Sequence, residues 1–139
     1  MVEVSREQTE LYQTWHNSAF SIERMSGKAP GTVILRMSGR FGLRNLGKGV
    51  SLDDLKRILE LTPEPGEEPV VKNILDFTGC PDIESFGLGM VMTHYVRCQR
   101  KGIKLVGAGL SRRLAKLFKM TKADTLFPIV GTVDEAEAC

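Results

Sequence analysis

Short apolar runs bounded by turn residues alternate along this chain with segments of helical periodicity. The pattern opens with runs at residues 20–25 and 32–37, which flank the turn-rich sequence SGKAPG and predict an antiparallel hairpin. Strand and helix patterns then follow one another to the end of the chain. This order favours one mixed sheet of four to five strands with helices packed against it. The expected fold class is therefore α/β.

The later elements follow from the same two periodicities. Apolar runs bounded by turn signals predict further buried strands at residues 70–77, 103–106 and 126–130. Capping residues predict helices that begin at Ser51, Ser85, Ser111 and Thr132. The helix that begins at Ser85 should run to Lys101, and Gly102 fits its C-terminal cap.

The chain length indicates one domain. Its 139 residues can bury a single core and are too few for two comfortable ones. Residues 1–17 are expected to form an N-terminal extension, within which Ser5 and Gln8 have the spacing of a capping box for a short helix over 5–17. The domain itself should span residues 18–138.

Composition excludes several classes of protein. Hydrophobic residues make up 42% and charged residues 26% of the chain, which is typical of globular domains and not of disordered or disulfide-rich ones. The longest nearly apolar stretch, 86–96, is too short to cross a bilayer, so no membrane insertion is expected. The first ten residues do not resemble a signal peptide, and the three cysteines lack metal-like spacing. We therefore expect a cytoplasmic protein with reduced thiols.

Basic residues gather in the second half of the chain, where no acidic residue falls between Ser85 and Ala123. Such a segment can meet an acidic partner or a phosphate backbone, or it can form a solvated face on two helices. Nucleic-acid binding is not favoured, because aromatic residues are not interleaved with the basic ones. The basic residues are Arg97, Arg100, Lys101, Lys104, Arg112, Arg113, Lys116, Lys119 and Lys122.

The residues that usually carry catalysis are dispersed. His16 and His94 lie in separate polar helical contexts, and His94 is expected to face water from the middle of its helix. No clustered ligands suggest a metal site, and the Gly87-Leu88-Gly89 sequence lacks the lysine of a phosphate-binding loop. We therefore expect no catalytic residues, no metal and no cofactor, and a chain that binds another protein.

The sequence IESFGLG at residues 83–89 follows a predicted strand and opens a predicted helix. It resembles the Asp-Ser-Ser/Thr-Gly-Leu-Gly signature of STAS domains, the anti-sigma factor antagonist family. The resemblance covers about residues 18–138 and includes TVILRMSG at 32–39, KGIKLV at 101–106, the helix at 111–118, DTLFPI at 124–129 and TVDEA at 132–136.

The resemblance implies a function. In that family, the serine after the acidic residue is phosphorylated by an anti-sigma factor serine kinase of the histidine-kinase-like ATPase class, and Ser85 occupies this position. The unphosphorylated domain would dock on the kinase and free a sigma factor, and phosphorylation would release the domain. The implied partner-binding residues are Arg40, Asp82, Glu84, Phe86, Gly87, Leu88 and Met90. A homodimer is left open.

Two departures from the signature keep other functions open. Glu84 replaces the usual Asp, and Phe86 replaces a small Ser or Thr, where its ring can either pack against the core or serve as a docking anchor. One alternative is a STAS scaffold subunit of a regulatory or transport assembly that is not phosphorylated. A second alternative is nucleotide binding at the helix terminus that carries Ser85.

Overall fold

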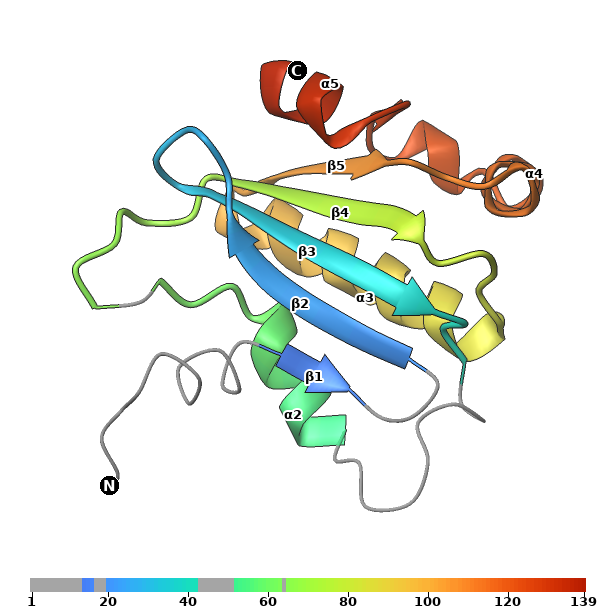
Figure 1. Cartoon of the computed structure of the whole chain (residues 1–139), viewed down its shortest axis with the longest axis horizontal. Helices are drawn as coiled ribbons and strands as arrows, with labels where there is room; N and C mark the ends of the chain where they lie inside the picture. The colour runs from blue at the N-terminus through green and yellow to red at the C-terminus, as the bar shows by residue number, and fades with distance from the viewer. Residues whose placement is uncertain (1–13, 17–19, 43–51, 64) are drawn as a thin grey trace.

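The computed structural model describes residues 14–16, 20–42, 52–63 and 65–139. Figure 1 shows one α/β domain in which a twisted sheet carries helices on both faces. In chain order the elements are β1 (Thr14–His16), β2 (Phe20–Ser26), β3 (Thr32–Gly39), α2 (Leu52–Leu59), β4 (Lys72–Gly79), α3 (Ser85–Lys101), β5 (Lys104–Ala108), α4 (Arg112–Met120), the 3-10 turn η2 (Ala123–Thr125), β6 (Ile129–Val130) and α5 (Val133–Ala138).

The sheet is mixed, and its six strands lie in the order of the sequence. The strands β1, β2 and β3 are antiparallel, and β3 to β6 are parallel. Each parallel step is crossed by a connection that contains a helix, as parallel pairing requires. Because the strands are parallel, the loops after β3, β4 and β5 all leave from one edge of the sheet, and the candidate site is built from these loops.

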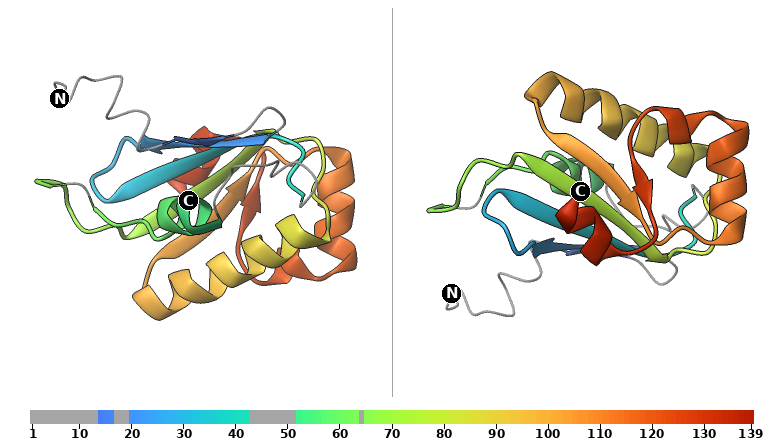
Figure 2. Two further views of the ribbon diagram at one scale, coloured as in Figure 1. Left: turned by 90° about the horizontal axis from the view of Figure 1, so that it is seen from below. Right: turned by 90° about the horizontal axis from the view of Figure 1, so that it is seen from above.

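The two faces of the sheet follow from the alternation of side chains along each strand. On one face, Leu35 and Leu75 join the main core, to which α2, α3 and α4 contribute Leu55, Val91 and Phe118. The opposite face carries a smaller apolar cluster, in which Ile34, Ile74, Val106 and Ala108 meet Ala136 of α5. Figure 2 shows α3 and α5 on opposite sides of the sheet. The outer side of α3 is therefore not covered by any described element.

The expected hairpin and alternating elements are confirmed, including the bounds of α3. Gly102 has the left-handed conformation of a helix C-terminal cap, with a φ of 71°. The Ser111 hydroxyl accepts a hydrogen bond from the Leu114 amide at 3.1 Å, and the Thr132 hydroxyl accepts one from the Glu135 amide at 3.1 Å. These two residues cap α4 and α5 as predicted.

Three expectations are corrected. Thr14–His16 form a strand and not the end of a helix, while the rest of the expected helix lies outside the described residues. This strand raises the count above the expected four to five. The last strand is shorter than predicted and covers Ile129–Val130, because the chain before it forms the η2 turn. His94 faces the core and is 2% exposed, because Asn73 of β4 provides a buried hydrogen-bond partner.

Candidate functional site

Ser85 is the first residue of α3, and its side chain is exposed. Glu84 stands at the N-cap with an extended backbone, φ −88° and ψ 172°, and its side chain makes no capping hydrogen bond. An N-cap reading of Ser85 is therefore off by one position. The serine hydroxyl lies at the positive end of the helix dipole, where negative charge is stabilised.

The loop before α3 is fixed by backbone hydrogen bonds to the end of β3. The Phe41 amide donates to the Asp82 carbonyl at 3.1 Å, and the Glu84 amide donates to the Phe41 carbonyl at 2.8 Å. The Phe41 ring stacks on Phe20 with centroids 4.4 Å apart and meets Phe86 edge-on at 6.4 Å. These contacts order the start of α3, so Ser85 has a defined position.

Asp82 is the centre of a small charged cluster around this loop. Its carboxylate lies 3.2 Å from Arg40 Nη2 and 3.9 Å from Arg113 Nε, and it accepts a hydrogen bond from the Ile83 amide at 2.9 Å. Arg40 also lies 3.8 Å from Glu84. Ion pairs of this exposure contribute little stability, so their main effect is to orient the loop.

The amino end of α4 is joined to the same loop. The Ser111 hydroxyl donates a hydrogen bond to the Pro81 carbonyl at 2.9 Å, next to the Arg113–Asp82 contact. Both views in Figure 2 show α4 beside the amino end of α3. The sequence pattern did not assign Arg113 to the site, although the run of basic residues in this helix was a signal for it.

The outer face of α3 is uncharged for most of its length. Residues 85–96 contain no Asp, Glu, Lys or Arg. We define the α3 outer face by its exposed residues Ser85, Gly89, Thr93 and Val96, the last with 41% of its surface exposed. Phe86, Leu88 and Met90 are half-buried against the core. An uncharged helix face of this kind can be covered by another protein without burying unpaired charge.

The expected site residues therefore fall into three groups. Arg40, Asp82, Glu84, Ser85 and Phe86 are brought together at the amino end of α3. Leu88 and Met90 continue along the helix, half-buried. Gly87 is buried, and a Cβ added there would lie 2.8 Å from Phe41 Cγ and 2.9 Å from Ile83 Cγ2. Gly87 is thus a packing residue, because only glycine allows α3 to approach Phe41 this closely.

Two titratable side chains packed behind the loop and α3, the Cys80 thiol and the His94 imidazole, are buried. Burial raises the pKa of the Cys80 thiol to about 11, and its Sγ lies 3.4 Å from the Asp82 carbonyl. Burial, with Arg97 and Lys101 nearby, lowers the pKa of His94 to about 4. Among the described residues, no three His, Cys, Asp or Glu side chains gather closely enough to hold a metal ion.

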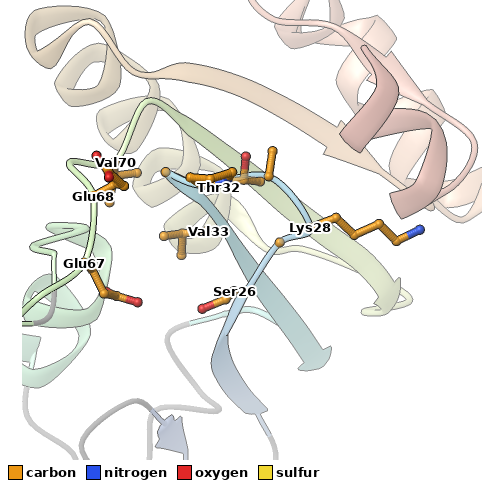
Figure 3. Close-up of a pocket in the computed structure, with 11 residues that line it drawn as sticks. Ser26, Lys28, Thr32, Val33, Glu67, Glu68 and Val70 are labelled. Carbon is orange, nitrogen blue, oxygen red and sulfur yellow. The ribbon is translucent and has the colours of Figure 1, made fainter.

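Two hollows lie away from Ser85. One, at the β2–β3 turn, has a volume of ≈ 230 Å³. Figure 3 shows its lining residues, which include Ser26, Lys28, Thr32, Glu67 and Glu68. It lies at the opposite end of β3 from the loop that contacts Asp82. A larger hollow of ≈ 790 Å³ lies on the α5 face. In it Asp76 pairs with Arg36 at 3.5 Å and accepts the Thr78 hydroxyl at 2.6 Å, so these polar groups are internally satisfied.

Solved structures with the same fold were found by comparison. The protein TM1081 of Thermotoga maritima aligns with a TM-score of 0.64 and 16% identity over 84% of this chain and 92% of that chain. A sulfate transporter family protein from Wolinella succinogenes gives a TM-score of 0.64 and 21% identity over 82% and 86%. An anti-sigma factor antagonist from Mycobacterium paratuberculosis gives 0.63 and 15% over 89% and 96%.

Two comparisons of the sequence itself, with curated proteins and with protein-family models, bear on the family of this chain. Curated protein sequences give no significant match. Within the described ranges, no helix has both the length and the hydropathy of a transmembrane span. The STAS domain model matches residues 26–136, which include the β2–β3 turn, the loop around Asp82 and all of α3 and α4. With this match over most of the chain, and with a fold shared by anti-sigma factor antagonists, the protein belongs to the STAS domain family.

Proposed function

We propose that this chain is an anti-sigma factor antagonist-like interaction domain that regulates transcription by partner switching. Its partner would be an anti-sigma factor serine kinase of the histidine-kinase-like ATPase class. The observation that carries the proposal is the exposed Ser85 at the head of the uncharged α3 outer face. The resemblance to the STAS signature implies that this serine is the phosphoacceptor. The kinase would cover this face while Ser85 is unmodified.

The proposed switch is local. The kinase transfers the γ-phosphoryl group of ATP to the Ser85 oxygen, the hydroxyl proton is lost and ADP leaves. The phosphate adds a charge of about −1.5 to −2 at the start of a face that otherwise carries none. Within the domain the helix dipole tolerates this charge, so the fold is retained. At the interface with the kinase, the same charge either loses its hydration water or is repelled by the partner surface. Both effects weaken binding, so the partner is released.

In this role, the Phe86 ring does not block access of the kinase to Ser85. Its ring is half-buried and packs edge-on against Phe41, so it is directed toward the core side of the helix start, while Ser85 remains exposed. The ion pair with Arg40 holds the Glu84 side chain, which is longer than the usual Asp, to one side of the loop. We propose that Arg40, Asp82, Glu84, Phe86, Leu88 and Met90 shape the docking site and that Gly87 supports it from within.

Phosphate incorporation tests the proposal. The histidine-kinase-like ATPases that the source genome encodes are purified and incubated with the domain and radiolabelled ATP. We expect one of them to label the wild-type chain and the Thr93→Ala variant, which loses an exposed hydroxyl on the same helix, and not the Ser85→Ala variant. Equal labelling of Ser85→Ala would refute the assignment of the phosphoacceptor.

A second function is favoured by one comparison. The sulfate transporter family protein from Wolinella succinogenes aligns as well as TM1081 does, with a TM-score of 0.64 for each. A STAS scaffold in a larger assembly would hold its partner without regard to phosphorylation. Size-exclusion chromatography distinguishes the two functions, because a scaffold complex should survive addition of ATP and a partner-switching complex should dissociate.

A further inference from the structure

The helix α4 carries its charges on one side. Its buried residues Leu114 and Phe118 face the core, and the exposed bases Arg112, Arg113, Lys116 and Lys119 lie on the opposite side. At 100° per residue these four positions fall within about a third of the helix circumference. We call these four residues the α4 basic face.

Little within the described part of the chain balances the charge of the α4 basic face. The first turn of α4 contains two arginines and no acid, although cations are disfavoured at the positive end of a helix dipole. Arg112 and Lys116 stand four residues apart, and Lys116 and Lys119 three apart, where like charges repel. Among the described residues, the α4 basic face forms one ion pair, Arg113 with Asp82, at 3.9 Å.

The bases at the end of α3 have an internal role and provide a contrast. Arg100 and Lys101 lie in the last turn, where the helix dipole favours cations. The Lys101 ammonium also donates a hydrogen bond to the Glu60 carbonyl at 2.7 Å, which holds the end of α2. On the α4 basic face, Lys119 lies in the last turn of its helix in the same way, whereas Arg112, Arg113 and Lys116 do not. The charge of these three residues is better explained by something outside the chain.

The α4 basic face lies next to the proposed phosphorylation site. Ser111, which caps α4, donates to the Pro81 carbonyl, and Arg113 contacts Asp82, three residues before Ser85. Three residues of chain span at most about 10 Å, so the Arg113 end of the α4 basic face lies near Ser85. A single partner that covers the α3 outer face would therefore extend over α4.

We propose that the α4 basic face binds an acidic surface on the same partner protein that docks on α3. This inference rests on the proposed function and names the chemistry of the partner. A protein partner is favoured over nucleic acid because the adjoining α3 outer face is uncharged and the aromatic ring of α4, Phe118, is buried. Charge complementarity of this kind accelerates association and depends on salt.

The proposal also explains the direction of the switch. A partner surface that is acidic enough to match α4 also repels a phosphate placed at Ser85, which lies near the Arg113 end of the α4 basic face. The same phosphate lowers the net positive charge that recruits the partner. Phosphorylation thus weakens binding both by repulsion and by reduced attraction.

Charge reversal tests this inference with a matched control. Stopped-flow association is measured with the purified kinase that labels Ser85, for wild type, Lys116→Glu, Lys119→Glu and Lys104→Glu. Lys104 is exposed and begins β5, so it lies at the other end of that strand from α4. At about 50 mM NaCl we expect each α4 variant to associate about tenfold more slowly and Lys104→Glu to change by less than about twofold, with the difference shrinking at about 300 mM.

The outcomes separate the inference from the function on which it rests. Equal rates for Lys116→Glu and Lys104→Glu, with Ser85 still labelled, would overturn the α4 inference alone. If no kinase labels Ser85, a peptide of alternating Glu and Asp is used instead, and absence of shifts in the α4 amide signals on its addition would overturn the inference. Tight binding of a DNA duplex or of phosphatidylglycerol vesicles that Lys116→Glu abolishes would also overturn it. Circular dichroism verifies that each variant is folded.

Discussion

Gly87→Ala should lower the free energy of unfolding by about 2 to 3 kcal/mol, whereas Gly89→Ala should raise it by about 0.5 to 1 kcal/mol. The two glycines occupy the same helix two residues apart, but they face opposite ways. A Cβ at Gly87 would collide with Phe41, including its backbone carbonyl, and with Ile83. A Cβ at Gly89 would meet nothing within 4 Å, so there the helix simply gains the better helix-forming residue.

Urea unfolding followed by circular dichroism measures both changes. The contrast is informative because the chemical substitution is identical and only the surroundings differ. A Gly87→Ala variant as stable as wild type would contradict the close packing of α3 on Phe41. A loss of stability in Gly89→Ala would contradict the open outer face of α3 on which the docking proposal depends.

The second large effect is a loss of stability in acid caused by His94. The His94 Nε2 and the Asn73 Oδ1 are 2.6 Å apart, and the Asn73 amide donates to the Val33 carbonyl at 2.9 Å, so Asn73 Oδ1 is the acceptor and Nε2 carries a proton. The other ring nitrogen, Nδ1, is buried and has no hydrogen-bond partner among the described residues. Protonating it would place a charge in the core beside α3's own Arg97 and Lys101.

The sign follows from the two pKa values. The pKa of His94 is lowered from 6.5 to about 4 in the folded state, so the unfolded chain binds a proton first as the pH falls. The contribution of neutral His94 to the free energy of unfolding is fully present above about pH 6.5 and is lost progressively as the pH falls toward 4. The loss should be about 2 kcal/mol by pH 5 and about 3 kcal/mol by pH 4.

A His94→Gln variant provides the control, because glutamine can donate to Asn73 and does not titrate. We expect the unfolding free energy of wild type to fall by about 2 kcal/mol more than that of the variant between pH 7 and 5. At pH 5 most carboxylates are still ionised, so the difference reports on His94. Parallel pH profiles for the two proteins would show that His94 is not the group responsible.

Most of the fold could be predicted from local patterns. The end of α3 followed from a C-terminal glycine, and the caps of α4 and α5 followed from single hydroxyl residues. The burial of His94 could not be predicted in this way, because its partner Asn73 is 21 residues away. The strand Thr14–His16 was missed for a similar reason, since a strand of three residues depends on the neighbouring edge of β2.

The candidate site was predictable in its position and not in its construction. The family signature placed Ser85 at the start of a helix, and the structure has it exposed there. The contacts that order the loop join Phe41 to Asp82 and Asp82 to Arg113, across separations that no local pattern encodes. The same holds for Gly87, whose buried role appears only when Phe41 is packed beneath it.

The most direct test of the proposed switch is the affinity of the partner kinase for the domain with and without phosphate on Ser85. Isothermal titration with the purified kinase, a non-hydrolysable ATP analogue and both forms of the domain provides the two dissociation constants. We predict that phosphorylation weakens binding by about a hundredfold or more, while thermal unfolding shows that both forms remain folded. Equal dissociation constants for the two folded forms would contradict it.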